Sequence, residues 1–598
     1  MKRFFIYLYL ITLIPNIANS TTPIEWQKLL HYEKNNKNYT SLVENNEYFL
    51  TPNGRYSPLD ELNEAINQFN TPNNTKKCDF PARFIYLKKK GLVKGNLNDC
   101  KDYQQYLNDL QAKSITMLFT NAYMSNPSSL FGHTLFRIDT KRRGSQLLAH
   151  GANFGADTGD ETGVLYAIKG LYGGYYGTFG IKPYYDVINL YNNIENRDIW
   201  EYELDLTKTE QELFLALMWE LKQAKIRYYF FTKNCSYILL SMLEATRPTL
   251  NLKDKFTTHV IPLSTLKAVN DEKLIKNTNY RPSRQSKLNH RYNQMNTAQK
   301  KALVDIIKNN NINLSPLKDS EKSDVLETAY QYIQYQYVEG NLELKNYRKK
   351  SFDLLKQRSQ INDNNLYFED LKTGQNPLFS HKEHSISFSI GSKNGNFFQE
   401  IALKPAYNDL LENSYGLLDG AEINVLETKI RHLDNNDKYT LSELNILSIK
   451  SLNGKNVMFS PFSYDINFGL KEVFNPKTNK DTLALKLETG VGEAYNLTKN
   501  ALIYVMTVPN ASYGGGLKEN GYIGFALKGG FYYNKSKFRL HSYIQKNYTT
   551  THQTKGETYS LEASYSINNN LNLYAKHQTF NTDFHDNKET LFGIKLNF

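Results

Sequence analysis

In the C-terminal third of the chain, apolar and polar residues alternate with a period of two, which predicts β-strands with one apolar and one polar face. From about residue 380 the pattern recurs, for example in Tyr559–Ile567, Ile523–Leu527 and Phe592–Phe598. About twelve such runs of about ten residues can be counted, joined by turns rich in Asn, Gly and Lys. This repetition is typical of an outer-membrane barrel, which places apolar side chains outside and polar ones inside. A soluble sandwich or a soluble closed barrel is the alternative.

The first 20 residues have the pattern of an export signal. A basic start precedes the apolar run Phe4–Ile14, and Ala18–Ser20 has the small-x-small pattern of a cleavage site. The apolar run is shorter than the ~20 residues that a membrane-spanning helix needs. We therefore expect the mature chain to begin near Thr21, outside the cytoplasm. The signal, the strand repeat and the aromatic C-terminal residue together favour the outer membrane over the soluble periplasm.

The length of 598 residues is too great for one hydrophobic core, because single cores stop growing at ~250–300 residues. We therefore expect about two to four domains. The formal net charge of +12 comes from Lys and Arg spread along the chain, and no block of them resembles a nucleic-acid-binding arm. We accordingly expect no nucleic-acid partner.

Upstream of the alternating region, the pattern predicts a mixed domain. Short apolar strands are expected at 114–119, 134–138, 146–150 and 200–204, and helices at 207–224 and 234–244. Thr207 and Glu210 have the spacing of a capping box at the start of the first of these helices. The glycine-rich stretch Gly170–Gly177 predicts an ordered loop near a cleft, with a simple long hairpin as the alternative.

The chain has three cysteines, and an odd number in an exported protein suggests one pair and one free thiol. Cys78 and Cys100 lie close in sequence, and we expect them to form a disulfide worth ~3 kcal/mol in the chain-entropy model. That leaves Cys235 free. A free thiol in an oxidising compartment needs a reason, of which inert burial is the common one.

The surroundings of Cys235 favour a nucleophile instead. The segment Lys233–Ser236 stands at the start of a predicted helix, and His133 stands at the mouth of a predicted strand. The thiolate is the reactive form, and both the positive end of a helix and a neighbouring imidazolium lower a thiol pKa from ~8.5. A cysteine that stands at the start of a helix and faces a histidine has the arrangement of a nucleophile with its general base. The backbone N–H groups near Ser236 and Tyr237 are candidates to stabilise an oxyanion.

The order of these residues is that of a permuted papain-like enzyme, because the histidine precedes the cysteine along the chain. The group with this order includes lecithin retinol acyltransferase. Five segments resemble the Lnb N-terminal periplasmic domain family: Asn126–Ile138, Gly151–Phe154, Gly170–Gly174, Lys233–Tyr237 and Tyr280–Ser283. The resemblance covers roughly residues 110–285, and the family is similar to permuted NlpC-type papain-like hydrolases. Its namesake transfers an acyl chain within bacterial lipoproteins, but is anchored by helices, whereas this chain ends in strands.

The resemblance implies Cys235 as nucleophile and His133 as base. Two residues compete to orient the imidazole: Asn153, which matches a residue typical of the family, and its neighbour His150. Asn234, Ser236 and Ser129 are further oxyanion or pocket candidates, although capping or turn formation is the simpler role for Ser129. We expect no metal site and no cofactor, because zinc-type cysteine pairs and paired helical histidines are absent from the sequence.

We therefore predict a multidomain α+β protein of the Gram-negative cell envelope. Its expected parts are a signal peptide at 1–20, an N-terminal helical domain with the disulfide at 21–108, a permuted papain-like Cys/His domain at 109–285, a helical connector at 286–378 and an antiparallel β-barrel of about 12 strands at 379–598. The expected function is a cysteine hydrolase or acyltransferase acting on outer-membrane lipids or lipoproteins through an acyl-Cys intermediate. A peptidoglycan endopeptidase or amidase, and a non-catalytic outer-membrane channel or assembly protein, are the alternatives.

Overall fold

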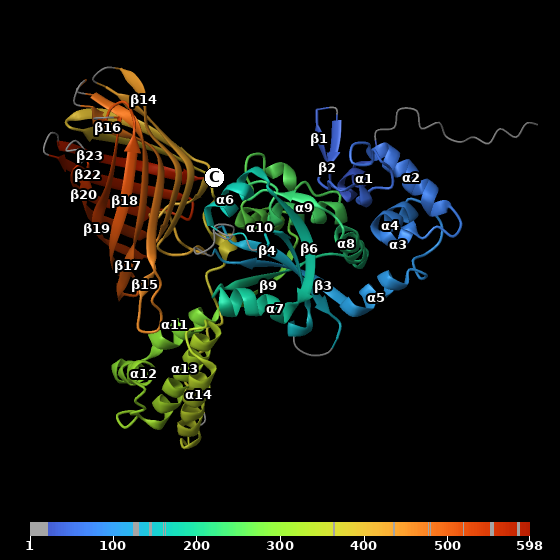
Figure 1. The fold of residues 1–598 in the computed structure, drawn as a ribbon, viewed down its shortest axis with the longest axis horizontal. Coiled ribbons are helices and arrows are strands. Elements are labelled where there is room, and N and C mark those ends of the chain that lie inside the picture. The colour runs from blue at the N-terminus through green and yellow to red at the C-terminus, as the bar shows by residue number, and fades with distance from the viewer. Residues whose placement is uncertain are drawn as a thin grey trace, which may run out of the picture. The chain divides into compact units, whose positions relative to one another are not determined.

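Figure 1 shows the computed structural model of the chain. The chain forms two compact units, which are described one at a time. Unit 1 comprises 1–114, 152–181 and 206–259, and unit 2 comprises 115–151, 182–205 and 260–598. The structure describes residues 22–598 apart from 37, 123–130, 143–145, 160, 162, 363–364, 435–436, 476–477, 479, 518–519, 551–554 and 583–585. The predicted signal peptide and the pocket candidate Ser129 lie outside the described residues.

Unit 1 is mainly helical. Its helices are α1 (Ile24–Leu29), α2 (Pro58–Asn70), α3 (Lys76–Asp79), α4 (Pro81–Lys89), α5 (Lys101–Leu110), α6 (Gly163–Tyr172), α8 (Lys208–Leu221) and α9 (Cys235–Thr246). A hairpin of β1 (Tyr32–Asn35) and β2 (Asn38–Ser41) follows α1. Strand β6 (Tyr175–Pro183), whose last residues belong to unit 2, pairs antiparallel with β8 (Ile226–Tyr228). The predicted capping box of Thr207 and Glu210 is present at the start of α8.

One hydrophobic core joins the N-terminal helices of unit 1 to α8 and α9. Trp26 and Phe84 are buried in the same cluster as Leu217 of α8 and Ala245 of α9. The disulfide predicted between Cys78 and Cys100 is formed, and Cys100 belongs to this core. The N-terminal helices therefore support the helix that begins with Cys235.

A charged cluster is buried beside this core. The guanidinium of Arg83 on α4 lies 2.7 Å from Glu61 of α2 and 3.2 Å from Glu220 of α8, and all three side chains are inaccessible to solvent. Burial raises the pKa of Glu220 to about 7, although Arg83 opposes the shift. Loss of one partner of such a buried cluster typically costs ~3–5 kcal/mol, because it leaves an uncompensated charge.

Unit 2 begins with strands that form the other part of the mixed domain. Strand β7 (Ile199–Leu204) lies between β3 (Ala112–Thr120, whose first residues belong to unit 1) and β9 (Ile275–Arg281), and both pairings are antiparallel. Strands β4 (His133–Thr140) and β5 (His150–Ala156) belong to the same sheet and come before β7 in the chain. Strand β5 begins in unit 2 and ends in unit 1. The strand predicted at 146–150 was wrong: Gln146–Leu148 is a single 3₁₀ turn and the strand begins at His150. Short helices lie between these strands in the chain: α7 (Tyr184–Ile188) and a π-helix (Asn189–Ile194) before β7, and α10 (Pro262–Asp271) before β9.

Four helices stand between this region and the barrel. They are α11 (Arg284–Gln294), α12 (Thr297–Asn309), α13 (Asp319–Val338) and α14 (Leu344–Ser359). Leu288, Leu303 and Leu326 are buried in their common core. Among the described helices of the chain, none is long and apolar enough to cross a membrane.

The C-terminal region is a closed antiparallel barrel of 12 strands, drawn in yellow to red in Figure 1. In order around the barrel the strands are β11 (Asn396–Lys404), β10 (Ser385–Lys393), β23 (Asp586–Asn597), β22 (Leu571–Thr582), β21 (Gly556–Ser566), β20 (Phe538–Thr549), β19 (Gly521–Lys535), β18 (Ala501–Tyr513), β17 (Lys480–Thr498), β16 (Ser463–Asn475), β14 (Lys438–Ser451) and β13 (Ala421–Leu433). Pairing of β13 with β11 closes the ring. The short strand β12 (Ala406–Asn408) also pairs with β13, and β15 (Gly454–Lys455) pairs with β17.

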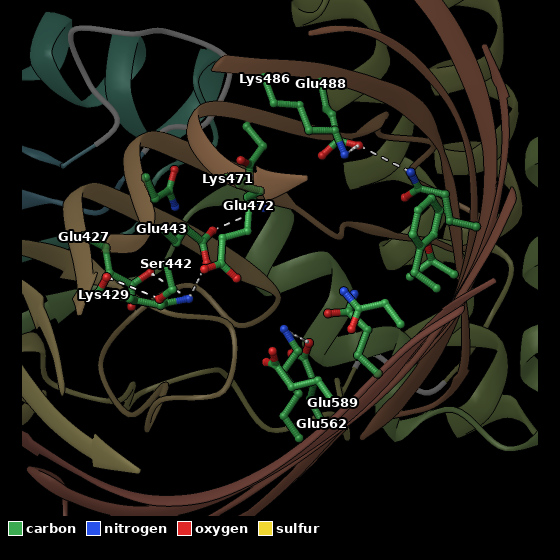
Figure 2. A pocket seen from close by; sticks show the side chains of 18 of the residues that line it. Glu427, Lys429, Ser442, Glu443, Lys471, Glu472, Lys486, Glu488, Glu562 and Glu589 are labelled. Atoms are coloured by element: carbon green, nitrogen blue, oxygen red, sulfur yellow. Dashed lines mark hydrogen bonds and ion pairs between the residues drawn. The ribbon is translucent and has the colours of Figure 1, made fainter. Parts of the chain in front are cut away.

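The barrel wall separates apolar from polar side chains. On β10, Ile386, Phe388 and Ile390 are exposed on the outside, whereas the serines between them are buried. The lumen is lined by charged and polar residues, ten of which are labelled in Figure 2. Lys429 is paired with Glu443 and Lys486 with Glu488. An apolar outside and a charged inside are the reverse of a soluble protein and match a membrane-spanning barrel. The predicted barrel of about 12 strands is confirmed.

Candidate active site around Cys235

Cys235 is the first residue of α9, and its position is set by the residue before it. The side-chain oxygen of Asn234 accepts hydrogen bonds from the N–H groups of Ser236 at 3.1 Å and Tyr237 at 3.3 Å, so Asn234 is the N-cap. Cys235 is a free thiol with 3% of its surface exposed, and its Sγ lies 3.7 Å from the hydroxyl of Ser236. The sequence therefore places a reduced cysteine where the positive end of a helix favours a thiolate.

The same cap changes the candidates for oxyanion stabilisation. The two N–H groups that sequence analysis favoured, those of Ser236 and Tyr237, already donate to Asn234. Their use by an oxyanion would require those bonds to break. The N–H of Cys235 itself donates instead to the hydroxyl of Tyr228, at 3.3 Å. A ligand oxygen that replaces this hydroxyl as acceptor would keep the N–H satisfied.

Tyr228, at the end of β8, is a site residue that sequence analysis missed. Its hydroxyl accepts the N–H of Cys235 and also shares a side-chain hydrogen bond with the thiol group. Burial raises the pKa of Tyr228 well above its ordinary value, and the charge of the Cys235 side chain raises it further. The phenol therefore keeps its proton and can donate it to a thiolate. Nothing in the sequence separates this residue from the other 43 of the 44 tyrosines.

Glu33 fixes the segment on both sides of Cys235. Its carboxylate accepts a hydrogen bond from the hydroxyl of Tyr237 at 2.5 Å and lies 2.7 Å from the ammonium of Lys233. Burial opposes ionisation of Glu33, but the pair with Lys233 and the Tyr237 bond lower its pKa overall. On the next turns of α9, the imidazole of His31 lies 2.8 Å from the hydroxyl of Ser241. The N-terminal hairpin region therefore holds the start of α9 through side-chain bonds.

The glycine-rich stretch is not the loop that its composition predicted. Gly170 lies in α6 and Gly177 in β6. A Cβ at Gly170 would stand 2.3 Å from the ring of Phe230, and one at Gly177 would stand 2.2 Å from the ring of Phe154. These glycines thus make room for aromatic rings of the chain itself. Because Gly177 has no side chain, the Phe154 ring reaches across β6 to stack on Tyr228, with ring centroids 5.8 Å apart.

Asn153 lies beside Phe154 on β5, half-buried. Side chains alternate between the faces of a strand, so Asn153 shares its face with Gly155, and His150 shares the face of Phe154. A Cβ at Gly155 would indeed stand 3.4 Å from the amide nitrogen of Asn153. Phe154 packs on Tyr228, the residue that bonds to Cys235.

His133 is the first residue of β4 in unit 2, and its ring lies near that of Tyr191, with centroids 5.8 Å apart. Unit 1 thus brings together Cys235, Asn234, Ser236 and the unpredicted Tyr228, whereas His133 and His150 belong to unit 2.

Further along β4, Arg137 forms a buried ion pair with Glu201 of β7 at 2.7 Å. Burial opposes the shift, but Arg137 and its hydrogen bond lower the pKa of Glu201 to about 2, so this network is ionised and structural.

The middle of the chain matches a known family. The family model described as the Lnb N-terminal periplasmic domain matches residues 102–272. This part of the chain is therefore similar to the Lnb N-terminal periplasmic domain family. Three other matches, at 19–90, 278–367 and 374–596, are to families described as domains of unknown function. No match was found among the curated proteins.

Solved structures similar to the chain are outer-membrane barrels. The NanC porin is 7% identical, covers 36% of this chain and 100% of its own, and has a TM-score of 0.25. The KdgM porin in complex with disordered oligogalacturonate is 12% identical, with coverages of 36% and 99% and a TM-score of 0.23. Outer membrane phospholipase A from Escherichia coli is 12% identical, with coverages of 38% and 94% and a TM-score of 0.23. These scores are too low to carry an argument about function. The Lnb-type periplasmic domain, together with a barrel that is apolar outside, identifies an outer-membrane protein of the Gram-negative envelope.

Proposed function

We propose that the Lnb-type domain is a cysteine hydrolase or acyltransferase that acts on acyl groups of envelope lipids or lipoproteins. Cys235 is the proposed nucleophile and His133 the proposed base. One observation supports this most strongly: a reduced cysteine in an exported chain begins a capped helix and bonds to a protonated phenol. An inert buried cysteine needs neither feature.

In the proposed reaction the imidazole of His133 takes the proton of the Cys235 thiol. The thiolate then attacks the carbonyl carbon of an acyl ester, so that a C–S bond forms while the carbonyl electrons move to oxygen. The N–H of Cys235 and the hydroxyl of Tyr228 are the proposed donors to that oxyanion. When the oxyanion collapses, the C–O bond breaks and the imidazolium gives its proton to the leaving alcohol.

The second half of the reaction releases the acyl group. Water, or a hydroxyl or amine of an acceptor, attacks the thioester while the imidazole takes the proton of the attacking group. Collapse of the second tetrahedral intermediate breaks the C–S bond and restores the thiolate, which the imidazolium reprotonates. Water gives hydrolysis and an acceptor gives acyl transfer, so the acceptor decides between the two activities.

The residue that orients His133 is proposed to be His150, with Asn153 as its rival. The alternation along β5 supports His150, because it shares a face with Phe154, which packs on Tyr228. Asn153 is supported only by its likeness to the family residue. Substitution of each by alanine distinguishes the two.

Intact-protein and peptide mass spectrometry tests the proposed function. Wild type and Cys235→Ala are incubated with a Gram-negative envelope extract and quenched in acid. We expect an acyl mass added to the Cys235 peptide of the wild type and no addition in Cys235→Ala. A muropeptide mass on Cys235 would instead favour the peptidoglycan alternative. A thiol that stays unmodified with lipid, lipoprotein and peptidoglycan donors, in a folded protein, would refute the enzyme and favour a binding or assembly role.

A further inference from the structure

The segment between β12 and β13 lies inside the barrel at one end. We name residues 409–420 the plug segment. Its first part, Leu410, Leu411 and Glu412, lines the barrel cavity, and Leu410 and Glu412 are buried. It follows β11 at the end of the barrel where β10 begins and β23 ends. Because the periplasmic domain precedes β10 in the chain, this end faces the periplasm.

Two lysines of the barrel wall hold the plug segment by charge. The ammonium of Lys404 on β11 lies 2.5 and 2.6 Å from the two carboxylate oxygens of Glu412. The ammonium of Lys595 on β23 lies 3.2 Å from Asp409 and 3.4 Å from Glu412. Lys404 and Glu412 each expose only 1% of their side chains. A buried, hydrogen-bonded pair of this kind is strongly disrupted when one partner is removed.

Polar side chains of β19 and β21 also hold the plug segment. Tyr532 and Asn534 of β19 donate to Asp419 at 2.8 and 2.6 Å. Ser564 of β21 donates to the carbonyl of Leu411 at 2.6 Å. In the ring of 12 strands, β19 stands six places from β11. The plug segment is therefore bonded to opposite walls, and spans the lumen.

The cavity above the plug segment extends toward the hairpin turns at the other end of the barrel. Its volume is about 840 Å³, and its lining includes Lys393, Asn475 and Thr550 at the turn ends of their strands. Ion pairs also cross it: Lys393 of β10 lies 2.6 Å from Glu472 of β16 and 2.6 Å from Asp481 of β17. The charged residues labelled in Figure 2 belong to this lining, from Glu427 to Glu589. The cavity is thus a charged vestibule whose floor is the plug segment.

We propose that the barrel is a closed pore, shut at its periplasmic end by the plug segment and latched by Lys404 and Lys595. With the latch intact the barrel anchors the periplasmic domain and does not conduct. Release of Glu412 and Asp409 from the two lysines leaves the segment held by its bonds to β19 and β21, so that it moves aside intermittently and joins the vestibule to the periplasm. The passage then admits small hydrated ions and solutes, because its wall is polar along its length.

Single-channel recording of the full-length protein in planar lipid bilayers tests this proposal. The wild type is compared with a plug variant, in which residues 410–418 are replaced by a Gly/Ser linker, and with the latch variant Asp409→Asn/Glu412→Gln. Glu557→Gln is the matched control, because Glu557 forms an exposed pair with Lys546 at 2.9 Å, away from the plug segment. Heat-modifiable migration on gels confirms that each barrel is folded.

We expect no conductance steps in the wild type and the control. In the plug variant we expect stable steps, with a mean current about tenfold or more above the wild-type background, and in the latch variant brief openings. Wild-type steps as large as those of the plug variant would overturn the proposal, and so would a folded plug variant that stays silent. If the plug variant does not fold, the latch variant decides. Silence of the folded latch variant would then overturn the proposal, and openings absent from Glu557→Gln would support it.

Discussion

Removal of the Tyr228 hydroxyl tests whether the phenol supports the nucleophile. In Tyr228→Phe the ring that stacks on Phe154 is kept, whereas the bonds of the hydroxyl to the N–H and thiol group of Cys235 are lost. A hydrogen bond to a charged group contributes ~1.5–3 kcal/mol. At 1.36 kcal/mol per pKa unit, loss of this bond to the thiolate raises the midpoint of thiolate formation by ~1–2 pH units.

The assay is the rate of iodoacetamide alkylation of Cys235 as a function of pH, read by peptide mass spectrometry. Tyr237→Phe is the matched control: Tyr237 also stands in the first turn of α9, but its hydroxyl bonds to Glu33. We expect the alkylation midpoint to move to higher pH in Tyr228→Phe and to stay within ~0.3 units of wild type in Tyr237→Phe. Equal midpoints in Tyr228→Phe and wild type, with unchanged thermal unfolding, would refute the role given to the phenol.

Three further predictions concern the base, its partner and a buried acid. Alkylation of Cys235 is expected to be appreciable near pH 6, and slower at that pH in His133→Ala. Cys235→Ser is expected to lose nearly all turnover, and a fully active Cys235→Ser protein would exclude Cys235 as the nucleophile. His150→Ala is expected to lower turnover ~10²-fold or more and Asn153→Ala much less, as kcat measurements would show; the opposite order would make Asn153 the orienting residue. Because burial raises the pKa of Glu220 from 4.5 to about 7, the folded state binds more protons than the unfolded state between these values. The free energy of unfolding should therefore fall as pH rises through this window, by up to ~3 kcal/mol, and urea unfolding of Glu220→Gln should lack that slope.

Much of the fold could be predicted because its signals are local. The alternation of apolar and polar residues up to Phe598 predicts the strands of the barrel, because one face of each strand contacts lipid and the other faces the lumen. Thr207 and Glu210 marked the start of α8, because a capping box depends on residues a few positions apart. The strand expected at 146–150 failed because a short apolar run does not distinguish a strand from a turn.

The features that sequence analysis missed depend on residues far apart in the chain. Gly177 was taken for a loop glycine, and only the packed ring of Phe154 explains it. The latch joins Lys595 to Glu412 across more than half of the barrel sequence. Period-two alternation says only that Lys595 faces inward, and Glu412 lies between strands, where alternation predicts nothing. Tyr228 was missed because a tyrosine near a cysteine is unremarkable in a chain rich in tyrosine.

The shared core of unit 1 has a practical consequence for anyone who shortens this protein for expression. A fragment that starts at residue 109, where the sequence suggested a domain boundary, would lose the partners of Leu217 and Ala245. It would also lose Glu33 and His31, which bond to the first turns of α9. Such a fragment would expose apolar surface and aggregate, and the thiol reactivity measured on what remained would be that of a damaged site. Fragments intended for enzymology should therefore keep residues 22–110.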